Sequence, residues 1–222
     1  MIKRPINIAG KAHTTNRNVL NKVLNHENLF RLLGKRTATI KTCFQILASK
    51  ENEISILEIG ASRSFTSGTI NTQDFNADPE AWDWGAGCFT AAIKILFPDC
   101  KLTSVDPNPE AIKVSKIILR SLGAEASFKQ TNSTDFLNKT TDKYDLIYMD
   151  HAESGGNDSC AVLHRNDAAL ILNKNLVKPD GLILIDDIQT AFNKGMYSIP
   201  FLEEQGLTHL SKNSYQALFR KD

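Results

Sequence analysis

From residue 54 onward the chain alternates short apolar segments with longer amphipathic ones, and this alternation restricts the fold more than any other feature of the sequence. The longer segments repeat apolar residues every three or four positions, as one face of a helix does. The expected strands are 55–59, 102–105, 126–130, 145–149 and 182–185, and the expected helices are 88–96, 109–122 and 160–175. Strands that alternate with helices form a mainly parallel sheet with right-handed crossovers.

The C-terminal end departs from this pattern. Two strand-like segments, 208–212 and 215–221, follow one another with only a short turn between them. A connection that short joins antiparallel strands. We therefore predict an α/β fold with a Rossmann-like, doubly wound sheet. The sheet would be mainly parallel, with an antiparallel C-terminal strand pair and additional N-terminal helices.

The N-terminal quarter of the chain is helical in character. Apolar residues recur at helical spacing through 13–50, and Gly34 separates two runs. Their apolar faces must pack on something, most simply on the domain that follows. We expect two parts: an N-terminal helical cap segment, 1–50, and a ligand-binding domain, 51–222, with an inserted loop at 62–84. The cap segment would cover part of the site.

Charge and composition exclude several classes of partner. Lys and Arg number 26 and Asp and Glu 25, so no basic excess favours nucleic acid. The N-terminus shows no signal-peptide pattern, and no apolar run reaches the ~20 residues that span a bilayer. The four cysteines form no C-x-x-C pair. We expect a cytoplasmic protein with reduced thiols that binds neither nucleic acid nor membranes.

Residues at the ends of three expected strands suit a nucleotide-like ligand. In an open α/β sheet, ligands bind beyond the carboxyl ends of the strands. Gly60 follows the first strand and permits a tight turn close to a ligand. Asp106 ends the second strand and can accept hydrogen bonds from a ribose diol. Asn132 and Ser133 follow the third strand and suit the edge of an adenine.

The order of these segments resembles the class I S-adenosylmethionine-dependent methyltransferases. The resemblance lies in 54–60, 102–109, 132–136, 144–150 and 178–188, and covers about 54–222. It includes the antiparallel final pair, which distinguishes this family from NAD-binding folds. It implies that the cofactor's methionine end meets Glu58, Gly60 and Ala61, its ribose meets Asp106, and its adenine meets Asn132 and Ser133. Asp150 is also counted among the cofactor-binding residues.

One segment departs from the family pattern. In the resembled family, the glycine-rich turn after the first strand usually leads straight into a helix. Here about twenty extra residues follow Gly60, and we interpret them as the insertion 62–84. Gly85 and Gly87, just before the helix 88–96, would then approach the cofactor's carboxylate together with the helix N-terminus. Arg63 could pair with the same carboxylate. Trp82 and Trp84 are either a lid over the site or anchors for the loop, and we favour anchors.

Three acids at the ends of the fourth and fifth strands predict a metal site. Asp150 ends the fourth strand, and Asp186 and Asp187 end the fifth. Clustered carboxylates suit Mg²⁺ or Ca²⁺ rather than zinc. The pattern resembles metal-dependent O-methyltransferases of the catechol and macrolide-sugar type, which implies a divalent ion, most simply Mg²⁺, that holds a substrate's hydroxyl oxygens. The alternative is that these acids are structural, for example as helix caps.

The identity of the general base stays open at this point. Glu153 stands at the position that the resembled family uses for its base, but as a glutamate in place of lysine or histidine. His151 has the better intrinsic pKa, and His164 is near in sequence. Glu153 could instead be a further metal ligand. The catalytic candidates are therefore His151 and Glu153.

The expected function is methyl transfer from S-adenosylmethionine to an oxygen of a small-molecule acceptor, such as a sugar or another diol. One alternative is an NAD-dependent oxidoreductase, although no G-x-G-x-x-G follows the first strand. Another is a catalytically inactive scaffold that kept the fold, because fold alone does not establish function. A homodimer, formed through the cap segment or the inserted loop, is a further expectation.

Overall fold

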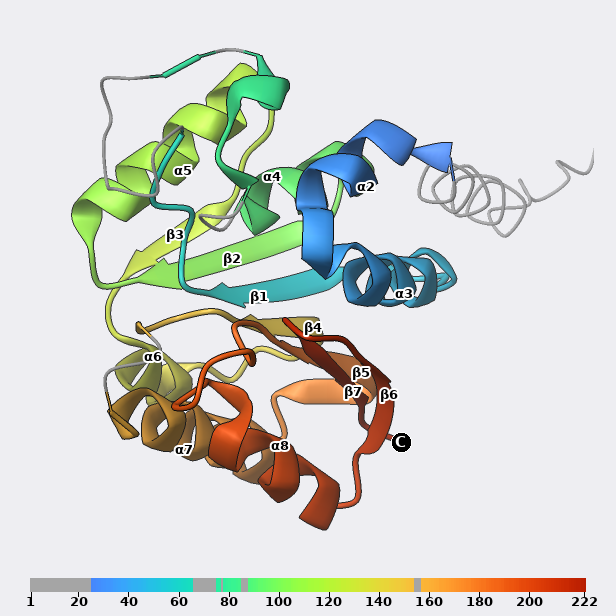
Figure 1. Cartoon of the computed structure of the whole chain (residues 1–222), viewed down its shortest axis with the longest axis vertical. Coiled ribbons are helices and arrows are strands. Elements are labelled where there is room, and N and C mark those ends of the chain that lie inside the picture. The colour runs from blue at the N-terminus through green and yellow to red at the C-terminus, as the bar shows by residue number, and fades with distance from the viewer. Residues whose placement is uncertain (1–24, 66–74, 77, 85–87, 154–156) are drawn as a thin grey trace, which may run out of the picture.

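A computed structural model describes residues 25–65, 75–76, 78–84, 88–153 and 157–222 (Figure 1). Its centre is a seven-stranded sheet with the order β3-β2-β1-β4-β5-β7-β6. The strands are β1 Ser55–Ile59, β2 Lys101–Asp106, β3 Ser127–Gln130, β4 Tyr144–Met149, β5 Val177–Ile185, β6 Thr208–Lys212 and β7 Ala217–Arg220. β1 to β5 pair in parallel, and β7 runs antiparallel to both β5 and β6. The predicted fold class is confirmed.

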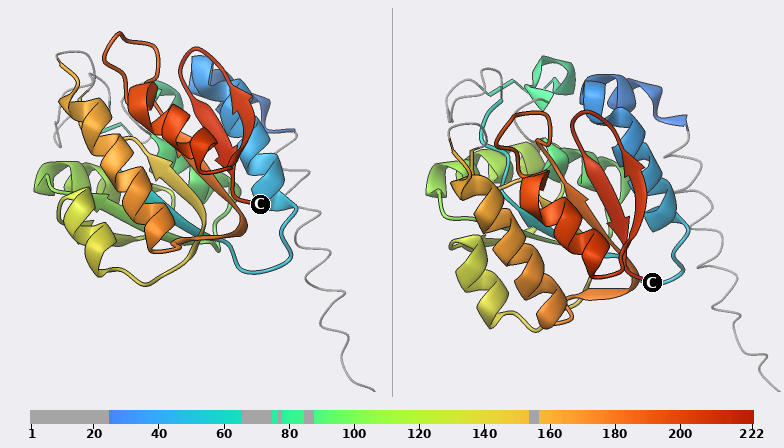
Figure 2. Two further views of the ribbon diagram at one scale, coloured as in Figure 1. Left: turned by 90° about the horizontal axis from the view of Figure 1, so that it is seen from below. Right: turned by 60° about the horizontal axis from the view of Figure 1, so that its bottom comes forward.

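Helices cover both faces of the sheet (Figures 1 and 2). On one face lie α2 Glu27–Leu33, the 3-10 turn η1 Gly34–Arg36, α3 Thr37–Ala48, α4 Phe89–Leu96 and α5 Pro109–Ser121. On the other lie α6 Ser133–Lys139, α7 Ser159–Asn173 and α8 Gly195–Glu204. A short 3-10 turn, η2 Pro79–Ala81, belongs to the loop before α4. No helix in these described ranges is long and apolar enough to cross a membrane.

The strands sort their side chains by the two-residue period of a pleated sheet. In β1, Ile56 belongs to the apolar cluster under α3 and α4, whereas Leu57 and Ile59 belong to the cluster under α6 and α7. The central strands β1 and β4 are almost fully buried. They therefore fix the positions of the residues that follow them.

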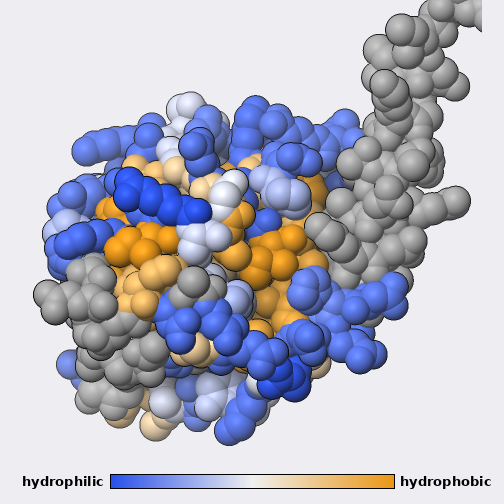
Figure 3. Space-filling model, turned by 90° about the horizontal axis from the view of Figure 1, so that it is seen from above, coloured by the Kyte–Doolittle hydropathy of each residue, from blue (hydrophilic) through white to orange (hydrophobic). Residues whose placement is uncertain are grey.

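The N-terminal helices share the core of the sheet domain. Leu29, Phe30 and Phe44 lie in the same buried cluster as Phe89 of α4, and the rings of Phe44 and Phe89 are 6.1 Å apart. On the face seen in Figure 3, apolar side chains gather in the middle and hydrophilic side chains surround them. Residues 25–50 thus pack on the domain as expected for the cap segment, while the domain boundary at residue 50 remains a prediction.

The end of the inserted loop is anchored by its two tryptophans. Trp82 and Trp84 are buried and stacked, with ring centroids 6.0 Å apart. Their indole N–H groups donate to the backbone carbonyls of Asn76 and Pro79 over 2.6 and 2.8 Å. This packing supports the interpretation as anchors. Residues 66–74 and 77 of the insertion, and the predicted cofactor glycines Gly85 and Gly87, lie outside the described residues.

β5 begins earlier than predicted. Pro179, Asp180 and Gly181, whose residue types predict a turn before the expected strand 182–185, lie inside β5. Asp180 adopts a positive φ of 54°, and the register against β4 shifts between Tyr144 and Leu146. The turn residues therefore form an irregularity within a longer strand, because pairing with β4 continues on both sides of them.

Candidate functional site

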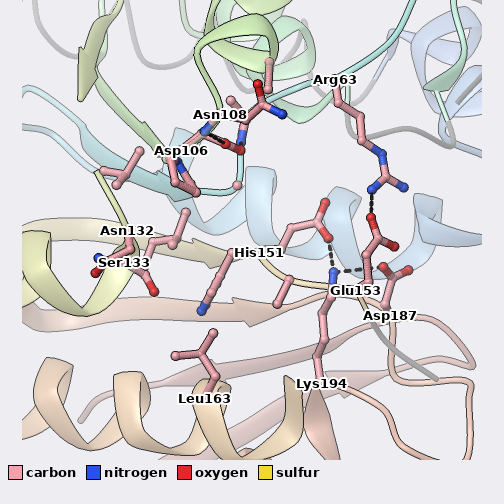
Figure 4. Close-up of a pocket in the computed structure, with 18 of the residues that line it drawn as sticks. Arg63, Asp106, Asn108, Asn132, Ser133, His151, Glu153, Leu163, Asp187 and Lys194 are labelled. Atoms are coloured by element: carbon pink, nitrogen blue, oxygen red, sulfur yellow. Dashed lines mark hydrogen bonds and ion pairs between the residues drawn. The ribbon is translucent and has the colours of Figure 1, made fainter. Parts of the chain in front are cut away.

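A cavity of about 320 Å³ opens at the carboxyl ends of β1, β2, β4 and β5 (Figure 4). It brings together most of the residues that the sequence predicted. Those on its lining are Gly60, Ala61, Arg63, Asp106, Asn132, Ser133, Asp150, His151, Glu153 and Asp187. Glu58 and Asp186 do not line it, and Arg36 and Leu163 line it without having been predicted. Lys194 also lines it, although its place before 196–201 in the sequence favours a helix start over a substrate contact.

Gly60 lets two strand ends approach closely. Its φ is 98°, and a Cβ at this position would lie 2.4 Å from the carbonyl oxygen of Asp150. Its N–H donates to the carbonyl of Val105 over 2.9 Å, and the N–H of Asp150 donates to the carbonyl of Ile59 over 2.8 Å. Since any side chain would push the end of β4 away, glycine is required here by both space and conformation.

The Asp106 carboxylate is held in a fixed orientation. Its Oδ2 accepts from the N–H of Ala61 over 3.0 Å, and its Oδ1 accepts from the N–H of Asn108 over 2.7 Å. A carboxylate oxygen can accept a second hydrogen bond. Asp106 also lines the cavity, so its remaining lone pairs suit the two hydroxyls of a ribose.

The polar residues after β3 have a structural role as well. The side chain of Asn132 caps α6: its Oδ1 accepts from the N–H of Asp135 over 2.7 Å and its Nδ2 donates to the Asp135 carboxylate over 2.9 Å. Ser133 is nearly buried and is the first residue of α6. Both residues line the cavity, but the Asn132 amide is committed to the cap.

Glu58 lies under α4, away from the cavity. Its carboxylate accepts from the hydroxyl of Thr90 over 2.7 Å and from that of Ser104 over 2.5 Å. Burial raises the pKa of Glu58 to about 7, against the effect of these two hydrogen bonds. The side chain lies on the face of β1 opposite Leu57 and Ile59. This position does not support the predicted direct contact between Glu58 and a cofactor.

The three predicted metal ligands do converge, but on two cationic side chains. Lys194 Nζ lies 2.6 Å from Oδ1 of Asp150 and 2.9 Å from Oδ2 of Asp187 (Figure 4). Arg36 Nε lies 2.8 Å from Oδ2 of Asp186, and its terminal nitrogen lies 3.2 Å from Asp187. Each of the three carboxylates therefore already has a cationic partner.

The donor set does not fit a divalent ion, and the predicted Mg²⁺ site is corrected here. Among the described residues, no His, Cys, Asp and Glu side chains form a group that could hold a metal ion. Burial opposes the charge of Lys194, but Asp150 and Asp187 raise its pKa above the ordinary value, so it stays protonated. A metal ion at Asp150 and Asp187 would have to displace this ammonium and would face the guanidinium of Arg36.

His151 is packed into a buried polar cluster beneath the cavity. Its ring stacks on His164 at 4.1 Å, and its Nε2 lies 2.9 Å from Oδ2 of Asp167, out of line for a hydrogen bond. Asp167 in turn accepts from the hydroxyl of Thr134 over 2.8 Å. Burial, and then His151, lower the pKa of His164 well below its usual value, so its ring is neutral.

Glu153 and Arg63 pair with each other at the mouth of the cavity. The guanidinium of Arg63 donates to the carboxylate of Glu153 (Figure 4). The Glu153 side chain is 79 % exposed. An exposed, paired carboxylate is poorly placed to act as a base on a shielded substrate. Arg63, expected at the cofactor's carboxylate, is engaged by Glu153 instead.

Two of the four described non-glycine residues with a positive φ lie on the same lining. Ala152 and Asp187, which follow β4 and β5, adopt φ values of 61° and 49°. Left-handed conformations are uncommon outside glycine and cost on the order of 1 kcal/mol or more. Such strain is found mostly where a side chain must be presented in one direction, and Asp187 presents its carboxylate to Lys194.

The match to known families agrees with this geometry. A family model described as a methyltransferase domain matches residues 83–219, more than half of the 222-residue chain. The chain therefore belongs to that methyltransferase-domain family, and its seven-stranded, mostly parallel sheet matches a Rossmann-like methyltransferase fold. No curated protein matches the sequence.

Solved structures share the fold at low sequence identity. A Klebsiella pneumoniae protein named as a candidate O-methyltransferase is similar with a TM-score of 0.50 and 14% identity, over 92% of this chain and 90% of that one. Monomeric WbdD gives 0.54 and 12%, over 84% of this chain and 41% of that one. NSun6 from Pyrococcus horikoshii, solved with SFG, gives 0.51 and 13%, over 79% and 48%.

Proposed function

We propose that the protein is an S-adenosylmethionine-dependent methyltransferase that acts on an oxygen of a small molecule such as a sugar or another diol. The observation that carries the proposal is that Gly60 and Asp106 line the same cavity. Gly60 leaves room where a Cβ would collide with the Asp150 backbone, and Asp106 presents an oriented carboxylate. These residues fit the methionine and ribose parts of the cofactor.

The chain's residues would divide the cavity into two ends. Asp106, with Ser133 beyond it, would hold the nucleoside, while Gly60 and Ala61 would lie along the methionine part. When bound, the cofactor supplies an electrophilic methyl group. Asp150, Asp187 and Lys194 line the other end, nearer β4 and β5, and would hold the acceptor. Holding both partners in one cavity replaces a bimolecular encounter by an oriented one.

Calorimetric titration with S-adenosylhomocysteine tests this proposal. We expect binding to the wild type and a loss of roughly 10- to 100-fold in Asp106→Ala, because hydrogen bonds to a charged group contribute ~1.5–3 kcal/mol. Asp142→Ala, an exposed acid outside the cavity lining, is the matched control and should bind normally. Absence of binding, or binding of NADH instead, would reject the proposal. Cofactor binding without transfer to any acceptor would favour the scaffold alternative.

A further inference from the structure

We propose that Lys194, in place of a divalent ion, holds the reacting hydroxyl of an uncharged acceptor. This inference rests on the proposed function and names the group that orients the acceptor. Three carboxylates converge here, yet among the described residues no group of side chains could hold a metal ion. The cation expected at that position is supplied by the chain itself.

The Lys194 ammonium has one hydrogen-bonding position left toward the cavity. Among the described residues, its Nζ donates to Asp150 and to Asp187, over 2.6 and 2.9 Å. An ammonium has three N–H donors. The side chain is only 3 % exposed, yet Lys194 belongs to the cavity lining, and Figure 4 shows it reaching the cavity from below. The third N–H is therefore available to an oxygen of a bound molecule.

The backbone around Lys194 is fixed from both sides. A Cβ on Gly195 would lie 2.5 Å from the side chain of Ile199 and 2.8 Å from that of Ile188, so the start of α8 is closely packed beside Lys194. The Ser198 hydroxyl donates to the Lys194 carbonyl over 2.7 Å. The Lys194 N–H donates to the carbonyl of the strained residue Asp187 over 3.3 Å. The ammonium is thus held in place before any ligand binds, which lowers the cost of binding.

The charges around Lys194 favour a neutral acceptor. Asp150, Asp186 and Asp187 carry up to three negative charges, against one positive charge each on Arg36 and Lys194. The cluster therefore carries no net positive charge, and it would give a phosphate or a carboxylate no net attraction. A hydroxyl can accept from Lys194 while it donates to a neighbouring carboxylate. A diol could place one hydroxyl against Lys194 and the other against a carboxylate.

The transfer then needs no metal ion. The acceptor oxygen forms its bond to the methyl carbon, the carbon–sulfur bond breaks, and its electron pair returns to sulfur. The hydroxyl proton passes to the Asp150 carboxylate and from there to water. Lys194 stays protonated throughout, stabilises the developing charge on the oxygen and aligns it for attack.

Mn²⁺ binding tests whether Lys194 takes the metal position. Electron paramagnetic resonance with Mn²⁺ alone should show at least tenfold weaker binding to the wild type than to Lys194→Met, in which the carboxylates lose their ammonium partner. Adding Asp187→Asn to Lys194→Met should remove the gain. Lys113→Met, an exposed lysine on α5, is the control and should behave as the wild type. A wild type that binds Mn²⁺ as tightly as Lys194→Met would overturn the proposal.

Cofactor binding and transfer separate this proposal from the proposed function. Lys194→Met should bind S-adenosylhomocysteine within twofold of the wild type. A screen with labelled S-adenosylmethionine should show transfer to neutral diols that survives chelator and falls about a hundredfold in Lys194→Met. Transfer that requires a divalent ion, or that is unchanged in Lys194→Met, would reject the role of Lys194. A wild type without affinity for S-adenosylhomocysteine would reject the proposed function, while the Mn²⁺ comparison still decides the place of Lys194.

Discussion

The ion pair between Arg36 and Asp186 joins the N-terminal helices to the floor of the site, and we expect Arg36→Met to destabilise the fold strongly. Arg36 Nε lies 3.0 and 2.8 Å from the two carboxylate oxygens of Asp186, whose side chain is completely buried. Removal of one partner of a buried ion pair costs ~3–5 kcal/mol, because the other charge stays buried without compensation. We expect a loss of this size in the free energy of unfolding at pH 8.

The free energy of unfolding that Arg36→Met loses should be smaller at lower pH. Burial, and then Asp150, raise the pKa of Asp186 from 3.8 to about 6, while Arg36 opposes them. A raised carboxyl pKa means that the folded state prefers the neutral acid. The contribution of Asp186 to stability is therefore most favourable below pH 3.8 and is lost as the pH rises through about 6. Without Arg36 the pKa rises further, so the variant loses less at pH 5 than at pH 8.

Urea unfolding followed by circular dichroism at both pH values measures this effect. Arg31→Met is the control, since Arg31 pairs with Glu80 at the surface with both side chains more than half exposed. Exposed pairs contribute at most ~1 kcal/mol. The reasoning fails if Arg36→Met loses no more stability than Arg31→Met at pH 8, or if its loss is the same at pH 5.

Two further substitutions test the cofactor end of the site. Gly60→Ala should weaken S-adenosylhomocysteine binding more than tenfold in calorimetry, because the added Cβ meets the Asp150 backbone. Gly206→Ala, which shares a positive φ but has open space around it, should bind normally, and equal losses in both would contradict the steric explanation. Thr90→Val removes a donor to Glu58 and should cost ~1–3 kcal/mol in unfolding experiments at pH 8. That cost should fall below pH 7, where the buried acid, whose pKa is already raised to about 7, takes up a proton; a loss independent of pH would contradict it.

The sequence was sufficient to predict the sheet and the strand ends. Buried strands of a parallel sheet are nearly continuous apolar runs, so β4 and β5 stood out, and the residues after them had to meet at one edge. Asp150 and Asp187 reach the cavity for this reason, and Asp106 reaches it as the last residue of β2. The position of Glu58 could also have been deduced, since its neighbours Leu57 and Ile59 occupy the opposite face of β1.

The partners of the acids could not be predicted in the same way. Arg36 contacts Asp186 across 150 positions of sequence, and no local pattern connects a turn between two N-terminal helices with the end of β5. Lys194 was interpreted as the start of a helix, and it does precede α8 directly. Its contacts with the acids depend on how α8 packs against α7 and β7. Three acids in a sequence therefore predicted a cluster correctly, but not the charge that balances it.

A crystal structure of the protein grown with S-adenosylhomocysteine and Mg²⁺ would test methyl-donor binding in this cavity most directly. We predict that the ribose hydroxyls contact Asp106, that the sulfur faces the end lined by Asp150 and Asp187, and that the Lys194 ammonium remains between those two carboxylates. A ligand bound away from Asp106, or an ion coordinated by Asp150 and Asp187 with Lys194 displaced, would contradict the assignment of this site.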